Sequence, residues 1–163
     1  MAKNHFLREY SAIQTLMLVL LRVSIGWHFL YEGLVKVFNP DWSSFGYLMD
    51  SKGIFAGIFK YMATHKSILQ TVDLLNIWGL VLAGTGMILG LFTRLSLIGG
   101  IMLLSLYYIS HPPMAGLQYI FPQEGSYLIV NKTLIEIIAL CLLLAFPNGQ
   151  IAGIDRFFQK SNK

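Results

Sequence analysis

Four ionisable side chains interrupt the first long apolar run of the chain, and they are the residues best placed to do chemistry. They are Arg22, His28, Glu32 and Lys36. On a helix that turns about 100° per residue, all four fall within about one third of the circumference. A charged side chain at the centre of a bilayer costs about 2.5–3.5 kcal/mol on insertion scales. This face is therefore predicted to look into a helix bundle or a wet cavity, where it can bind a ligand or handle protons.

Ion pairing offers a purely structural alternative for part of this face. Glu32 and Lys36 lie four residues apart with the glutamate first, which is the favourable order for a pair on a helix. Lys132 and Glu136 have the same spacing in the last apolar run. Pairs of this kind can serve packing alone, so the spacing leaves both interpretations open.

Further polar residues are expected at the same depth in the membrane as Glu32 and Lys36. They are Asp73, Asn76, His111, Lys132 and Glu136. Four segments would then contribute to one polar layer in the outer half of a bundle, which favours a ligand or proton-handling site. The expected catalytic residues are Glu32, Asp73, His111 and Glu136, and the expected cofactor-binding residues are Arg22, His28, Lys36, Asn76 and Lys132.

Arg22 is expected to lie deeper than this layer, and no acidic residue of another apolar run is expected at its level. Its guanidinium has four alternatives. It can bind a quinone oxygen, a backbone carbonyl or a lipid headgroup, or it can snorkel to the membrane interface.

The histidines and the cysteine do not form a metal-binding pattern. His28 and His111 have no neighbouring ligand at a diagnostic spacing, and Cys141 lies alone on an apolar run, where an inert buried thiol is the expectation. We expect no metal or haem. Redox chemistry would then require a bound quinone or a protein partner.

The composition is that of an integral membrane protein. Of the 163 residues, 55% are hydrophobic and 12% are charged, about half the charge usual in soluble domains, and the mean hydropathy is +0.61. A single cysteine excludes a disulfide-stapled module. The net charge of +4 comes from basic residues scattered at the ends of apolar runs, which favours a lipid bilayer over nucleic acid.

Four segments are long and apolar enough to cross a bilayer. They lie at about 15–38, 72–92, 95–109 and 128–146. The first is expected to stay as a helix, because Arg22 interrupts it and no signal-peptide cleavage site follows. Only Thr93–Arg94 separates the second from the third, which predicts an antiparallel hairpin. The sequence thus predicts an all-α, four-helix integral membrane bundle that forms one domain over residues 1–163.

The loop after the first span is expected to contain a further helical segment. From Gly53 onward, apolar residues recur at helical spacing among lysines, which is typical of a helix in the membrane interface. A lid over an outer pocket is the alternative. Basic residues predict that both termini lie in the cytoplasm. The residues counted are Lys3, Arg8, Arg94, Arg156, Lys160 and Lys163.

Small residues also form a stripe on the second span, where a neighbouring helix is expected to approach closely. They are Gly79, Ala83, Gly86 and Gly90.

Several short motifs resemble the DoxX/DoxD family. The first run has Arg22-Val-Ser-Ile-Gly26 with Glu32-Gly33 and Lys36, and the second ends in a glycine-rich stretch closed by Thr93-Arg94. The last run contains Glu136 and is followed by Pro147-Asn148-Gly149 and Ile154-Asp155-Arg156. The resemblance covers nearly the whole chain. The positions that carry it are Arg22, Gly26, Gly33, Lys36, Arg94 and Glu136.

This resemblance implies a four-helix protein in the inner membrane of a bacterial or archaeal cell. In the branch with a long tryptophan-containing outer loop, it implies the small, quinone-reactive subunit of an enzyme that oxidises thiosulfate. A small anion could be attracted by Lys36, Lys132 and His111. Two other functions stay open: a non-catalytic scaffold for a partner subunit or a homo-oligomer, and a small transporter or lipid-binding protein.

Overall fold

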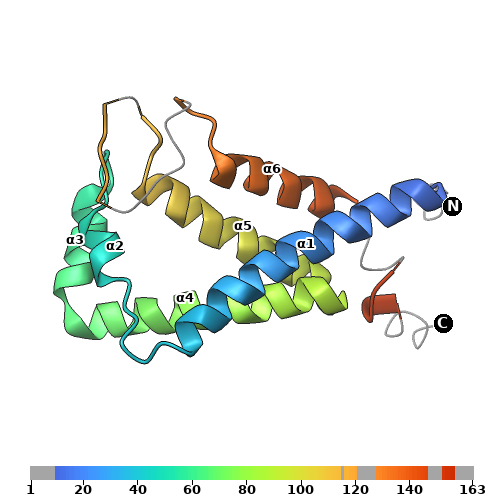
Figure 1. Ribbon diagram of the computed structural model, residues 1–163, viewed down its shortest axis with the longest axis horizontal. Helices are drawn as coiled ribbons and strands as arrows, with labels where there is room; N and C mark the ends of the chain where they lie inside the picture. The colour runs from blue at the N-terminus through green and yellow to red at the C-terminus, as the bar shows by residue number, and fades with distance from the viewer. Residues whose placement is uncertain (1–9, 115, 121–127, 147–151, 157–163) are drawn as a thin grey trace, which may run out of the picture.

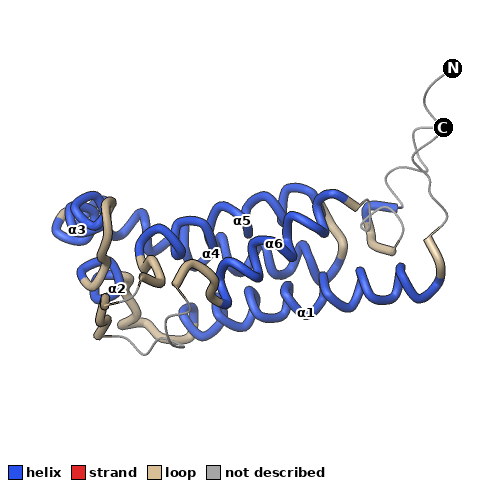
Figure 2. Tube along the Cα trace, turned by 90° about the horizontal axis from the view of Figure 1, so that it is seen from above, coloured by secondary structure: helices blue, strands red, loops and turns tan. Residues whose placement is uncertain are grey.

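The computed structural model describes residues 10–114, 116–120, 128–146 and 152–156. Within these ranges the fold is all-helical, as predicted, and no strand occurs (Figures 1 and 2). The helices are α1 (Ala12–Val37), α2 (Phe45–Met49), α3 (Ala56–Thr64), α4 (Lys66–Leu89), α5 (Thr93–Ser110) and α6 (Lys132–Ala145).

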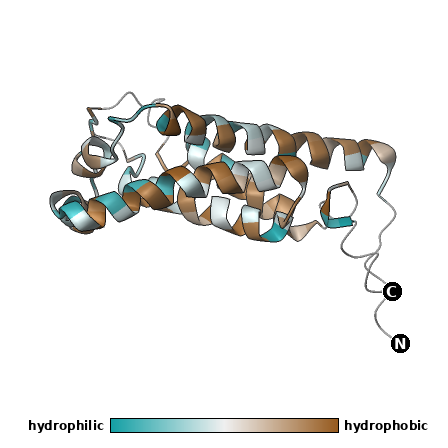
Figure 3. Ribbon diagram, turned by 90° about the horizontal axis from the view of Figure 1, so that it is seen from below, coloured by the Kyte–Doolittle hydropathy of each residue, from teal (hydrophilic) through white to brown (hydrophobic). Residues whose placement is uncertain are grey.

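The four long helices lie side by side and alternate in direction (Figure 1). The most extensive contact is that of α1 with α4, while α5 packs on both α4 and α6. Among the described residues, α1, α4 and α5 are long and apolar enough to cross a membrane. Hydrophobic residues run along these helices, many of them on the outside (Figure 3). The chain therefore has the build of a multi-pass membrane protein.

Local sequence signals set the ends of these helices. Ser11 and Gln14 form a capping box at the start of α1, and the Asn131 side chain accepts a hydrogen bond from the Leu134 amide at the start of α6. At the end of α4, Gly90 adopts a left-handed conformation with φ of 64°. The predicted hairpin is confirmed, but its turn lies at Gly90–Phe92, because Thr93 already begins α5.

Glycines allow α1 and α4 to touch closely. A Cβ at Gly84 would collide with the Leu30 backbone, and one at Gly26 would lie 2.9 Å from the Met87 Cβ. The predicted small-residue stripe omitted Gly84. Its members Gly79 and Gly86 instead face side chains of α5.

The end of the bundle opposite the start of α1 is covered by α2 and α3 (Figure 1). The helix predicted after Gly53 is confirmed as α3. Leu48 of α2 forms a small core with Phe59 and Ala63 of α3. The next helix, α4, begins at Lys66, earlier than the predicted 72.

The last helix is shorter than predicted, with 14 residues in place of a span over 128–146. Leu128, Ile129 and Val130 precede it and are exposed. Several residues used in the predictions lie outside the described ranges. They are Lys3, Arg8, Pro147, Asn148, Gly149, Lys160 and Lys163.

Candidate functional site

A cavity of about 220 Å³ lies among the four long helices. We call it the bundle pocket. Its lining residues are His28, Phe29, Glu32, Lys36, Leu80, Leu104, Tyr107, Lys132, Thr133 and Glu136. The pocket therefore brings together five of the predicted site residues, from both the first and the last apolar run.

Two hydrogen-bonded side chains, one from α1 and one from α6, line one side of the bundle pocket. His28 Nδ1 lies 2.8 Å from Glu136 Oε1. The Glu136 side chain is 11% exposed and that of His28 is 40% exposed. Glu136 thus has a partner on another helix, although its spacing from Lys132 had suggested one on its own helix. The pair combines two groups that can exchange a proton beside a cavity.

Lys36 is held at the pocket by groups of three other segments. Its Nζ donates to Asn76 Oδ1 at 2.9 Å, and Asn76 Nδ2 donates to the Tyr107 hydroxyl at 2.6 Å. The ammonium also lies 4.9 Å from the centre of the Trp42 ring, within the range of a cation–π contact. Asn76 therefore positions Lys36 and does not itself line the pocket.

The ion pair between Glu32 and Lys36, which the spacing left open as an alternative, does not form. No salt bridge joins their side chains in this described part of α1, because the Lys36 ammonium turns toward Asn76. Glu32 is an exposed residue at the lining of the pocket. His28, Glu32 and Lys36 do share one face of α1, as predicted, but the partner of Lys36 is Asn76 on α4.

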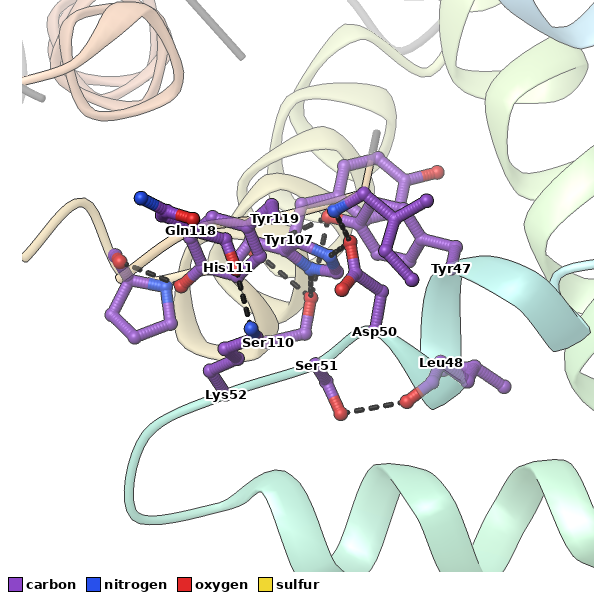
Figure 4. A network of polar contacts seen from close by, with 12 residues as sticks. Tyr47, Leu48, Asp50, Ser51, Lys52, Tyr107, Ser110, His111, Gln118 and Tyr119 are labelled. Carbon is purple, nitrogen blue, oxygen red and sulfur yellow. Dashed lines mark hydrogen bonds and ion pairs between the residues drawn. The ribbon is translucent and has the colours of Figure 1, made fainter. Parts of the chain in front are cut away.

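A second polar cluster lies at the end of the bundle near α2 (Figure 4), and its residues do not line the pocket. We call it the outer histidine cluster: His111, Ser110, Asp50, Tyr47 and Tyr119. The His111 ring stacks between Tyr47 and Tyr119, at centroid distances of 3.9 and 4.8 Å. His111 Nδ1 lies 2.9 Å from Ser110 Oγ, and Nε2 lies 4.0 Å from Asp50 Oδ2. His111 was predicted to share one layer with the α1 residues. It does not line the pocket with them, but Tyr47 connects it to the lining residue Tyr107.

Burial controls the protonation of this cluster. It lowers the pKa of His111, and the negative charge of the nearby Asp50 carboxylate offsets part of this decrease. Burial also raises the pKa of Tyr47 to about 12. Near neutral pH the ring stack therefore contains neutral side chains.

Asp73 also lies outside the pocket lining, although it was predicted to be catalytic. Its carboxylate accepts hydrogen bonds from Ser43 Oγ at 2.9 Å and from the Ser44 amide at 2.8 Å. These contacts fasten the loop before α2 to α4. Because the loop folds back onto α4, Asp73 has a positioning role for the outer helices.

Arg22 is buried at the other end of the bundle, with only 2% of its surface exposed, so snorkelling is wrong. Its Nη2 donates to the Ala152 carbonyl at 2.6 Å, which is the backbone-carbonyl alternative. Asp155 lies in the same segment and accepts hydrogen bonds from the Phe92 and Thr93 amides. We call this group the terminal clasp. It binds the chain after α6 to the turn between α4 and α5.

Sequence reasoning missed Trp42 and Asp50 as parts of these clusters. Tyr107 was expected to add a hydroxyl to the polar layer, and it does lie at the pocket. No spacing rule linked Trp42 to Lys36. Asp50 meets His111 only because the outer loop folds onto the end of α5. Among the described residues, no group of three or more His, Cys, Asp or Glu side chains is placed to hold a metal ion.

The chain was also compared with known proteins. The model of the DoxX family matches residues 17–112. The matched region runs from α1 to the residue after His111 and ends before α6. No curated protein and no solved structure matches the chain. Because the family model covers more than half of the 163 residues, the chain belongs to the DoxX family.

Proposed function

We propose that the chain is the membrane subunit of a quinone-linked oxidoreductase and that the bundle pocket receives the quinone headgroup. The observation that carries this proposal is the hydrogen bond of His28 with Glu136 at the wall of a cavity between four helices. Ionisable groups inside a membrane bundle are costly unless they are paired or in use. Here they converge on a space that can hold a ligand.

The residues present fit a quinone ring. The pocket volume of about 220 Å³ is below the roughly 300–1,000 Å³ of sites for drug-sized ligands, so it suits one ring-sized headgroup. Phe29, Leu80 and Leu104 supply apolar lining for the ring. Lys36 and His28 supply nitrogen donors for carbonyl oxygens.

Two parts of the pocket would serve the bound ring differently. A quinone accepts two electrons and two protons, and this redox chemistry is what the group supplies when bound. The carboxylate of Glu136 and the imidazole of His28 lie 2.8 Å apart, so either can hold a proton and pass it to a ring bound in the cavity. The Lys36 ammonium has three donors and uses one on Asn76, which leaves donors for an oxygen of the ring.

The electron donor is best sought on a partner subunit. The family resemblance suggests that thiosulfate is the substrate, and Lys36 and Lys132 at the pocket supply positive charge for such an anion. The identity of this anion comes from the resemblance. Identifying a stable partner by purification would extend the proposal to a defined enzyme.

We further propose that α6 is a fourth membrane span. Its 14 residues cover about 21 Å, less than the roughly 30 Å of a hydrocarbon core. The exposed Leu128, Ile129 and Val130 lengthen the apolar stretch at its start. The basic residues then favour both chain ends in the cytoplasm, and the family resemblance favours the inner membrane of a bacterial or archaeal cell. Impermeant thiol reagents should label a cysteine at Lys60 in a Cys141→Ser background from outside, and the reverse pattern would invert the orientation.

Binding of a short-chain benzoquinone to the full chain in lipid nanodiscs tests the functional proposal. We expect saturable binding that weakens about tenfold, or about 1.4 kcal/mol, in Glu136→Gln and in His28→Gln. His65→Gln is the matched control, because the His65 ring does not line the bundle pocket and interacts with Tyr61 and Thr64 beside it. Absence of saturable binding would contradict the proposal, and so would equal affinity in all four proteins.

A further inference from the structure

The outer histidine cluster has no part in the proposed quinone site, yet it joins three segments that cover the end of the bundle. The Ile120 amide donates to Asp50 Oδ2 at 2.8 Å, and the Lys52 amide donates to the Ser110 carbonyl at 3.1 Å. Lys52 Nζ also donates to the Gln118 carbonyl (Figure 4). The cluster therefore ties the end of α2 and residues 116–120 to the end of α5.

His111 lies at the centre of these contacts and is almost completely buried. It is 4% exposed, and its Nε2 has no hydrogen-bond partner among the described residues. The Asp50 side chain, 3% exposed, is the nearest acid, at 4.0 Å. The other titratable groups that face His111 are Tyr47 and Tyr119, which stack on its ring, and Lys52.

A neutral imidazole suits this position better than a charged one. A proton on His111 would bring a positive charge into a buried stack, next to the positive charge of Lys52. The Asp50 carboxylate compensates in part, but 4.0 Å is too long for a direct hydrogen bond. Protonation of His111 is therefore expected to destabilise the aromatic stack at which the three segments meet.

The same stack touches the bundle pocket. Tyr47 lies edge-on to Tyr107, with ring centroids 5.8 Å apart, and its hydroxyl lies 3.5 Å from the Tyr107 carbonyl. Tyr107 lines the pocket and accepts the hydrogen bond from Asn76. A change in the outer histidine cluster can therefore reach the pocket through the edge-to-face contact of Tyr47 with Tyr107.

We propose that the outer histidine cluster is a pH-sensitive latch, in which neutral His111 holds α2 and residues 116–120 against α5 and protonated His111 releases them. This device is independent of the ligand that the bundle pocket takes. Because the pKa of His111 is lowered in the folded protein, the stabilisation is complete above about 6.5, the ordinary value for histidine. It is lost as the pH falls through the lower pKa of the folded site.

Hydrogen–deuterium exchange on the full chain in nanodiscs tests the latch. Protection factors, which divide out the chemical exchange rate at each pH, are compared at pH 7.5 and pH 5. We expect protection of residues 45–52 and 116–120 to fall at least about fivefold at the lower pH. The central parts of α4 and α5 should keep theirs.

Three variants decide whether His111 is the sensor. His111→Phe keeps an aromatic ring in the stack and should make the protection independent of pH, while the control His65→Phe should keep the wild-type response. Asp50→Asn removes the compensating charge and should move the midpoint of release to lower pH. A wild-type response that is absent, or that survives in His111→Phe, overturns the latch. Should His111→Phe fold poorly, a midpoint that stays or rises in Asp50→Asn overturns it.

Discussion

Arg22 and His28 lie six residues apart on the same helix, and the bundle treats them in opposite ways. In the terminal clasp, Arg22 is sealed at 2% exposure and bonded to the backbone of Ala152. In the bundle pocket, His28 is 40% exposed and bonded to another ionisable side chain, Glu136. A charge that ties two chain segments together serves stability, whereas an ionisable pair beside a cavity is available for a ligand. Within one helix, the free-energy cost of burying a polar side chain is thus offset by a backbone hydrogen bond at Arg22 and by an ionisable partner at His28.

The largest expected effect comes from breaking the terminal clasp. Arg22→Ala removes a buried hydrogen bond and leaves unfilled space near Gly90 and Gly153. We expect a loss of about 3 kcal/mol in the free energy of unfolding, measured by thermal or denaturant unfolding in detergent. Quinone affinity of the folded fraction should stay unchanged. A variant of wild-type stability that binds no quinone would reverse the comparison.

The pair at the pocket should show the opposite balance. His28→Leu with Glu136→Leu removes both partners and should change the free energy of unfolding by only about 1 kcal/mol, because no unpaired charge remains. Binding of a short-chain quinone should nevertheless be lost. If the double variant unfolds readily and its folded fraction binds normally, the pair is structural like the terminal clasp.

A smaller effect is expected from Asp155, the acidic member of the terminal clasp. Partial burial raises the pKa of Asp155. The hydrogen bonds from Thr93 and Phe92 and the positive charge of Arg22 lower it by more, so the pKa lies below its ordinary value. The stabilisation is present above the ordinary pKa of about 3.9 and is lost as the pH falls through the lower folded value. Asp155→Asn should cost about 1 kcal/mol at pH 7 and flatten the acid limb of the unfolding curve. An unchanged acid limb would contradict this role.

The smallest effect is expected at Glu32. Its side chain is exposed and forms no ion pair with Lys36, so Glu32→Gln should change the free energy of unfolding by less than about 0.5 kcal/mol. Lys36→Met should cost more, because it leaves the Asn76 carbonyl without its donor. Equal effects of the two variants would instead favour the Glu32–Lys36 ion pair that the spacing left open.

These contrasts also explain what the sequence could predict. Helical periodicity identified the face shared by His28, Glu32 and Lys36, because neighbours on one helix are fixed by local geometry. The apolar runs likewise identified the long helices. The length of α6 was overestimated because hydropathy does not mark where a helix starts, whereas the Asn131 cap does.

Partners distant in the sequence could not be predicted in this way. His28 meets Glu136 across 108 positions, and Arg22 meets Ala152 across 130. Local spacing suggested nearer partners for Glu136. These contacts depend on how α6 and the segment after it return along the bundle, which no single helical pattern contains.

A photoreactive quinone analogue tests the central claim most directly, since it reports where a ring binds in the full chain in membranes. We expect covalent labelling, displaced by excess unmodified quinone, at the segments that line the bundle pocket, which are residues 28–36, 80, 104–107 and 132–136. Labelling should fall sharply in Glu136→Gln and persist in Arg22→Lys. Displaceable labelling confined to other parts of the chain, or none at all, would contradict the assignment of the pocket as a quinone site.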